Sequence, residues 1–127
     1  MVKIIDTNLI LRLILGDIPQ QVDSTEKLLQ EHSVTVLNIS IFECVYTLEG
    51  QYSMDRLHIV SSLQPILLHP KIECDNVCVI ALNRYMSDNS LSFADCYLLE
   101  SARQQNGKLY TFDKALIKTS AGTAKSP

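Results

Sequence analysis

Short apolar runs alternate with longer amphipathic stretches along most of the chain. Runs at residues 2–5, 34–37 and 109–112 predict buried strands, because they are short and mostly β-branched or aromatic. Residues 66–72 are ambiguous and could hold a weak strand. The stretches between these runs predict helices at residues 9–15, 19–31, 41–49, 54–64, 76–86 and 92–106. This alternation is typical of an α/β domain, with a parallel sheet and helices on both of its faces.

Several residues at the ends of these stretches indicate where the helices begin and end. Gly16 and Gly107 are placed to end helices, whereas Ser53 is expected to cap the 54–64 helix and Pro65 to stop it. In the 92–106 helix, five positions at helical spacing predict an inward stripe: Ala94, Tyr97, Leu98, Ser101 and Ala102.

The composition indicates a single folded domain. The chain has 127 residues, of which 46% are hydrophobic and 20% charged, and this length suits one domain with its own core. We predict a folded domain over residues 1–119 and a polar, flexible tail over residues 120–127. No apolar run approaches the ~20 residues that a membrane-spanning helix needs. The N-terminal residues do not resemble a secretory signal, so we expect a cytoplasmic protein without membrane contact.

Four cysteines, Cys44, Cys74, Cys78 and Cys96, could in principle form two disulfides. Without an export signal, a chain with its own core does not need them. The spacing of Cys74 and Cys78 differs from that of a zinc knuckle, and no second pair follows. We interpret all four as small buried apolar residues.

Four acidic residues lie near the ends of the predicted strands. Asp6 directly follows the first strand, Glu43 lies just past the second, and Asp113 directly follows the last. Asp95 lies in the first turn of the helix that leads into that last strand. The carboxyl ends of parallel strands share one edge, where ligands bind. Carboxylates gathered there repel one another and usually need a cation, and hard oxygen ligands favour magnesium or manganese over zinc.

Each of these acids also has a purely structural interpretation. Glu43 and Asp95 each stand three residues after a serine, as in a capping box. Asp6 and Asp113 could each cap the helix that follows. Capping and metal binding are compatible, because the amino end of a helix stabilises an ionised carboxylate.

The net charge of −3 is not typical of a nucleic-acid-binding protein. Without the four acids at the strand ends, however, acidic and basic residues are almost equal in number. A divalent ion at this edge would offset its repulsion of a phosphate backbone, so the charge does not exclude a nucleic-acid substrate. Arg12 is the one charge in an apolar helix, and it either extends to solvent or reaches toward the acidic edge as a phosphate or partner contact.

Three segments and one residue carry a family resemblance. Ile-Ile-Asp-Thr-Asn at residues 4–8, Leu-Ser-Phe-Ala-Asp at 91–95 and Leu-Tyr-Thr-Phe-Asp at 109–113, together with Glu43, stand in the order and at the spacing of known motifs. They resemble the motifs of PIN-domain ribonucleases, most closely the VapC-like toxins of bacterial toxin–antitoxin pairs. The resemblance covers residues 2–118.

The resemblance implies a three-layer α/β/α sandwich with a central parallel sheet. It also implies Mg²⁺- or Mn²⁺-dependent hydrolysis of RNA phosphodiester bonds and inhibition by a cognate antitoxin, and we expect a homodimer. The catalytic and metal-binding residues that carry over are Asp6, Glu43, Asp95 and Asp113, with Asn8 and Thr111 in supporting roles.

The sequence departs from the family at its C-terminal end. After residue 119 no apolar run follows, so we expect the sheet to lack its final edge strand.

Two alternative functions remain open. A PIN-like module that binds RNA or protein without cleavage would lack one or more of the acids, and all four are present. A phosphatase-like α/β enzyme would need a second aspartate where Asn8 stands.

Overall fold

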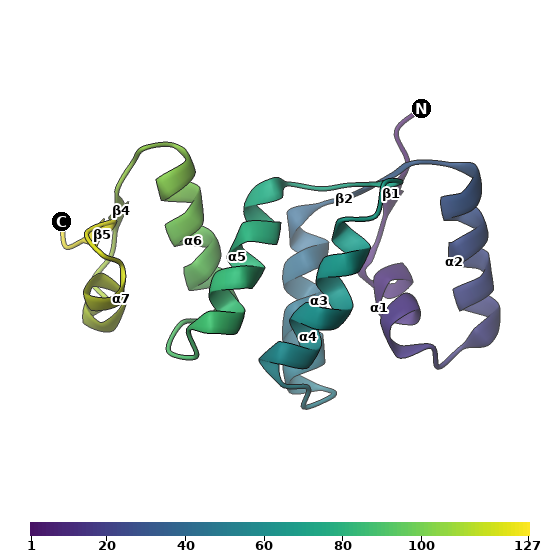
Figure 1. Ribbon diagram of the computed structural model, residues 1–127, viewed down its shortest axis with the longest axis horizontal. Helices are drawn as coiled ribbons and strands as arrows, with labels where there is room; N and C mark the ends of the chain where they lie inside the picture. The colour runs from purple at the N-terminus through teal and green to yellow at the C-terminus, as the bar shows by residue number, and fades with distance from the viewer.

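The computed structural model describes residues 1–127 as seven helices and five short strands spread along one long axis (Figure 1). In chain order they are β1 (Ile4–Ile5), α1 (Thr7–Leu15), α2 (Pro19–Glu31), β2 (Val34–Val36), α3 (Asn38–Gly50), α4 (Arg56–Leu67), β3 (Ile72–Glu73), α5 (Asn76–Ser87), α6 (Phe93–Gln104), β4 (Leu109–Tyr110), α7 (Lys114–Thr119) and β5 (Ala124–Lys125). This confirms the predicted α/β class with parallel strands. None of the helices is both long and apolar enough to cross a membrane.

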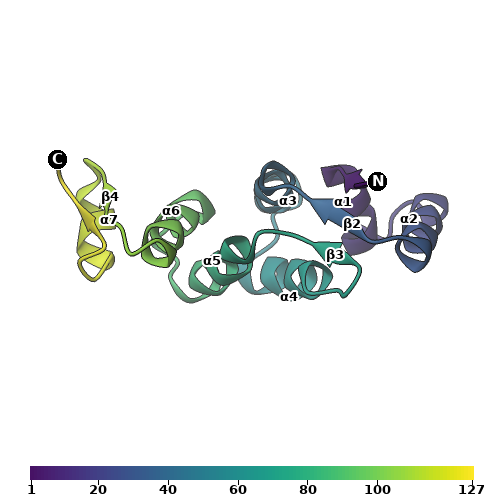
Figure 2. The same cartoon turned by 90° about the horizontal axis from the view of Figure 1, so that it is seen from above.

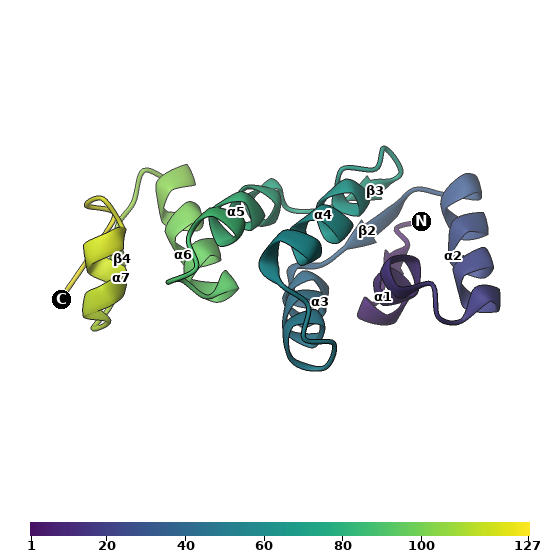
Figure 3. The same ribbon diagram turned by 60° about the horizontal axis from the view of Figure 1, so that its bottom comes forward.

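The parallel strands form two sheets instead of one. β1, β2 and β3 form a three-stranded sheet in that order, with Ile4 opposite Thr35 and Val34 opposite Ile72. β4 pairs only with β5, with Leu109 opposite Ala124. In all three views the two sheets lie toward opposite ends of the long axis (Figures 1–3). The strand that leads to Asp113 is therefore not a neighbour of β1.

The hydrophobic core lies mainly between the three-stranded sheet and helices α1 to α6. Each of the three central strands contributes at least one buried side chain, and the largest fully buried aliphatic side chains are Ile10, Ile41, Leu48, Ile59, Leu63, Leu82 and Leu99. Helix α1 ends at the glycine that the sequence indicated. Gly16 adopts a left-handed φ of 62° after α1, a conformation that favours glycine, and its N–H donates to the carbonyl of Arg12.

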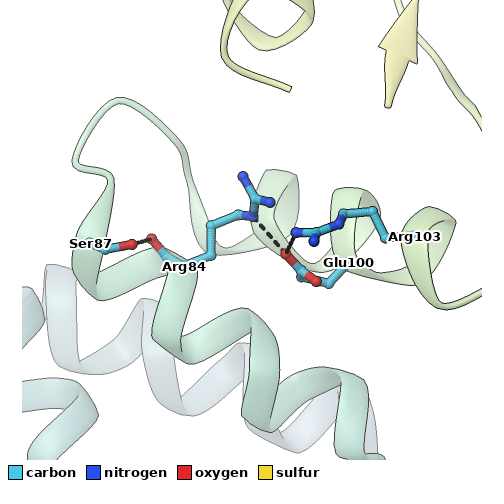
Figure 4. Close-up of polar contacts among 4 residues, drawn as sticks. All are labelled: Arg84, Ser87, Glu100 and Arg103. Atoms are coloured by element: carbon cyan, nitrogen blue, oxygen red, sulfur yellow. Dashed lines mark hydrogen bonds and ion pairs between the residues drawn. The ribbon is translucent and has the colours of Figure 1, made fainter. Parts of the chain in front are cut away.

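Helix α6 is attached to α5 by a buried ion cluster (Figure 4). Oε1 of Glu100 accepts hydrogen bonds from Nε of Arg84 at 2.7 Å and Nη1 of Arg103 at 3.1 Å, and Glu100 is only 5% exposed. The ring of Phe93 packs edge-on against that of Tyr85, with centroids 5.7 Å apart. These contacts fix the position of α6 beside α5.

The face that α6 buries differs from the predicted stripe. Its buried side chains are Phe93, Cys96, Leu99 and Glu100. The predicted inward positions are only partly buried, and Leu98 is 45% exposed. The prediction was wrong because helical spacing identifies apolar stripes but not which stripe the neighbouring helices cover. A second, half-covered apolar face therefore remains on α6.

The two boundaries predicted for the 54–64 helix also need correction. Ser53 has a left-handed φ of 49° and does not cap α4; the Oδ1 of Asp55 does, accepting from the N–H of His58 at 2.7 Å. Pro65 lies inside the last turn of α4 and does not stop it. A proline so close to the end removes a single backbone donor and leaves the preceding turns intact.

The C-terminal residues carry the final strand that the sequence was expected to lack. Strand β5 pairs with β4, and the N–H of Leu109 donates to the carbonyl of Thr123 at 2.9 Å. Ser120 is buried, and its hydroxyl accepts from the N–H of Ala124 at 2.9 Å. The tail expected to be flexible thus contributes a strand. Backbone pairing builds this strand, and backbone pairing needs no apolar run.

Candidate active site

Asp6 and Glu43 line the same hollow in the surface, which has a volume of about 500 Å³ and lies between α1 and α3. Asp6 stands between β1 and α1, and Glu43 lies in the second turn of α3. Both residues are exposed. The rest of the lining is largely polar and comes from the same two helices and the two residues that follow α3: Thr7, Asn8, Leu11, Arg12, Ser40, Thr47, Gln51 and Tyr52.

The Asp6 carboxylate is held at the amino end of α1. Its Oδ1 accepts a hydrogen bond from the N–H of Asn8 at 3.0 Å, as an N-cap does. The second oxygen has no hydrogen-bond donor and is free to bind a ligand. The proposed structural role of Asp6 is therefore confirmed, and it leaves half of the carboxylate available.

Glu43 has no capping role. Helix α3 begins at Asn38 after Leu37, so Glu43 falls beyond the first turn, and no hydrogen bond or ion pair engages its carboxylate. The capping-box interpretation of Ser40 and Glu43 is therefore wrong, because the helix starts three residues earlier than the sequence pattern indicated. A carboxylate without a structural partner, beside a second one, is suited to binding a cation.

The buried thiol of Cys44 lies near both carboxylates. Its pKa is raised to about 12, mainly by burial and in addition by the negative charges of Glu43 and Asp6. Both acids therefore act on the same point beneath the hollow. Two negative charges so close together favour a cation beside them.

Asp95 lies outside this hollow, in the capping box of α6. The hydroxyl of Ser92 accepts from the N–H of Asp95 at 3.1 Å, and Oδ2 of Asp95 accepts from the N–H of Ser92 at 3.4 Å. This end of α6 contacts α3, because the N–H of Ala94 donates to the hydroxyl of Tyr46 at 3.2 Å. The capping interpretation of Asp95 is confirmed.

Asp113 lies farther away, at the start of α7. Its Oδ1 accepts from the N–H of Leu116 at 3.1 Å, so it caps that helix. The hydroxyl of Thr111 accepts from the N–H of Asp113 at 3.0 Å and so helps to orient it. Thr111 therefore supports Asp113 locally. Both residues lie between β4 and α7, and these two elements are apart from β1 (Figure 1).

The structure thus brings together Asp6, Glu43 and Asn8, but neither Asp95 nor Asp113. No three acidic, histidine or cysteine side chains lie close enough to share a metal ion. Two carboxylates still fit Mg²⁺, which is usually held by one or two carboxylates and completes its shell with water and substrate phosphate. The four-acid site as a whole stays a prediction.

Arg12 lies toward the acidic hollow, one of the two positions considered from the sequence. It lines the hollow with Asp6, and its Nη1 lies 3.1 Å from Oδ2 of Asp17. Its Nε is buried without a partner. The guanidinium therefore stands near the carboxylates with hydrogen-bonding capacity left, which suits a phosphate contact.

Three further polar residues line the hollow, and sequence reasoning missed them. Ser40 and Thr47 lie on α3 and Gln51 caps its C-terminal end, all on the same side as Glu43. Their spacing of three or four residues from one to the next is the signal that could have identified them.

Residues 3–122 match the PIN domain family. The match covers nearly the whole chain, and the protein belongs to this family of nucleases. No curated protein and no solved structure matches the chain.

Proposed function

We propose that the protein is a metal-dependent endoribonuclease that hydrolyses RNA phosphodiester bonds with Mg²⁺ or Mn²⁺. The observation that carries the proposal is the hollow between α1 and α3, where the carboxylates of Asp6 and Glu43 both have free oxygens. Membership of the PIN domain family supports it independently.

Within this proposal Asp6 and Glu43 are the principal metal ligands, and Asp95 and Asp113 complete the acidic set. A divalent ion held there would lower the pKa of a bound water and offset charge on the scissile phosphate. Asn8 fixes the orientation of Asp6 through its N–H. Arg12 supplies a positive charge beside the hollow that attracts the phosphate backbone.

We further propose that the protein is the toxin of a toxin–antitoxin pair, with a cognate antitoxin as its partner. A second hollow, of about 660 Å³, lies between α1, α2 and α4, and half of its lining is apolar, including Leu13, Leu29 and Ile66. Both hollows are lined in part by α1, so a partner segment seated in the half-apolar hollow could extend along this helix and place a basic side chain over Asp6 and Glu43.

One observation favours the alternative of a binding module without nuclease activity. Asp95 and Asp113 are apart from Asp6 in this structure, and no three acids share a site. With Asp95 and Asp113 held away from the hollow, Asp6 and Glu43 could still bind an ion or a phosphate there. The complete set of four carboxylates proposed for cleavage would then be absent.

An RNA cleavage assay tests the proposed function. The purified protein should cleave structured RNA in the presence of Mg²⁺ or Mn²⁺ and lose activity in EDTA. Asp6→Asn and Glu43→Gln should each reduce cleavage by at least about 100-fold, since loss of outer-shell partners alone costs 10–100-fold. Asp23→Asn is the matched control, because Asp23 is an exposed acid on α2 outside the hollow. RNA cleavage that does not need a metal ion, or full activity in both Asp6→Asn and Glu43→Gln, would refute the proposal.

A further inference from the structure

Four strands, β1, β3, β4 and β5, each have one edge without a partner. Of these, β1 and β4 are the two that carry exposed apolar side chains. β1 pairs only with β2, and β4 pairs only with β5. The apolar side chains around these edges are exposed: Ile4 by 58%, Tyr110 by 57% and Phe112 by 83%. Parallel strands are otherwise almost always covered on both faces, and an open, apolar strand edge readily pairs with another chain.

The segment that carries β4 has little structure of its own to stabilise it. We call residues 108–127 the C-terminal unit; it consists of two strands of two residues each and a helix of six. Its buried side chains are only Leu116, Ser120 and Ala124. Outside the unit itself, its main contacts are with α6. A two-stranded ribbon of this size is marginal in water, so the unit requires a larger surface to pack against.

The unit is held away from β1 of its own chain. Helix α6 is fixed to α5 by the ion pair between Glu100 and Arg84, and to α3 by Phe42, whose ring centroid lies 5.0 Å from those of both Phe93 and Tyr97. The N–H of Gly107 donates to the carbonyl of Ala102 at 2.8 Å, which sets the direction in which the chain leaves α6.

The linker between α6 and β4 is too short to bring the unit back to its own sheet. It has four residues, 105–108, which span at most about 14 Å when fully extended. In Figures 1 and 2, α6 and α5 lie between the unit and the three-stranded sheet, and packed helices are separated by about 8–10 Å each. The C-terminal unit therefore cannot cover the open edge of β1 in its own chain. That edge is left accessible to the C-terminal unit of another copy.

We propose that two copies of the chain exchange their C-terminal units, so that β4 of each copy pairs in parallel with β1 of the other. Asp6 directly follows β1 and Asp113 follows β4, and the carboxyl ends of adjacent parallel strands lie at one edge. The exchange therefore places Asp113 of the partner subunit beside Asp6 and Glu43. Because each copy gives and receives one unit, the assembly closes as a two-fold dimer. The contribution of Asp113 to cleavage rests on the proposed function, whereas the strand exchange does not.

Cross-linking between lysines tests the exchange without any activity measurement. Lys3 precedes β1, and Lys108 and Lys125 lie in the C-terminal unit. Equal amounts of ¹⁴N- and ¹⁵N-labelled protein are unfolded together, refolded and treated with an amine-reactive cross-linker. We expect light scattering to give an assembly with twice the mass of one chain. We also expect Lys3–Lys108 or Lys3–Lys125 cross-links in which the two peptides carry different nitrogen labels. Cross-links only within equally labelled copies, or a monomeric mass without these cross-links, would overturn the proposal.

A pair of matched variants tests the contact itself. Phe112→Asp should convert the dimer to a monomer with unchanged helical content, because Phe112 is 83% exposed in a single chain. Leu57→Asp, an equivalent change at a 64% exposed position on α4, should leave the dimer intact. Ile4→Asp provides the same test from the other strand. A dimer that survives both Phe112→Asp and Ile4→Asp would contradict the exchange.

Mixing two inactive variants then tests the shared site. When Asp6→Asn and Asp113→Asn proteins are refolded together, a mixed dimer contains one site with both acids intact, and we expect about half of its sites to cleave RNA. Each variant refolded alone should be inactive. Mixed-label cross-links without this recovery would show that the exchange is correct and that the role of Asp113 in cleavage is wrong.

Discussion

Arg84 and Glu100 join α5 to α6 through a hydrogen-bonded ion pair of 2.7 Å between Nε and Oε1. Arg84 is itself mostly covered, whereas Arg103, the second cation on the same carboxylate oxygen, is 54% exposed. Arg84 therefore provides most of the compensation for the buried charge of Glu100. The same ion pair holds α6 in position against α5.

Arg84→Met should lower the free energy of unfolding by about 3 kcal/mol, because it leaves a buried carboxylate with only an exposed partner. Arg103→Met is the matched control and should cost less than about 1 kcal/mol, as exposed ion pairs do. Urea unfolding followed by circular dichroism, at one protein concentration, measures both. Equal losses in the two variants would show that the pair is not the dominant contact.

The capping box of α6 allows the two roles of Asp95 to be separated. Ser92→Ala removes the hydroxyl that accepts from the N–H of Asp95 and should destabilise the protein by about 1 kcal/mol while leaving cleavage unchanged. Asp95→Asn retains much of the capping geometry and removes the charge, so cleavage should be lost if Asp95 belongs to the metal site. Thermal unfolding and RNA cleavage of both variants give the comparison. Wild-type cleavage by Asp95→Asn would leave this residue with a capping role only.

Metal binding should stabilise the fold through the hollow between α1 and α3. At a concentration 100 times the dissociation constant, a ligand that binds only the folded state adds about 2.7 kcal/mol. Scanning calorimetry with millimolar Mg²⁺ or Mn²⁺ should therefore show a higher Tm for the wild type. The double variant Asp6→Asn, Glu43→Gln should show no such rise, whereas Asp23→Asn should behave as the wild type does. The same rise in the double variant would place the metal elsewhere.

The proposed antitoxin and the metal ion should compete for the same carboxylates. A basic side chain of the partner over Asp6 and Glu43 would occupy the position of the cation. Calorimetric titration with the antitoxin should therefore give a weaker affinity at high Mg²⁺ than at low Mg²⁺, and Asp6→Asn should also weaken binding. An affinity that is equal under both conditions and for the variant would indicate inhibition through another surface.

Most helices were predictable from the sequence because their signals are local. The 19–31 helix agrees with α2 at both ends, and the other five predicted helices differ by a few residues at their termini. The short helix α7 was not predicted. Periodicity and capping residues act within one or two turns, so they are visible in the sequence alone. The same holds for Asp6 and Glu43, since strand ends and helix starts place them close together.

The pairing of the strands could not be predicted in this way. β1, β3 and β4 have two residues each, and nothing in so short a segment specifies its neighbour. The separation of β4 from β1, and with it that of Asp113 from Asp6, depends on how α6 packs. The final strand, β5, was missed because backbone hydrogen bonds build it, and its two residues carry no apolar pattern.

The short strands also have a consequence for the order in which the protein folds. Helices α5 and α6 are joined by a five-residue loop, so their contacts close a small loop and form early. The three-stranded sheet joins strands separated by whole helices, and such pairings form later. During synthesis, β1 emerges from the ribosome well before β4. A newly made chain therefore passes through a stage in which its helices are formed while the edge of its first strand is still unpaired.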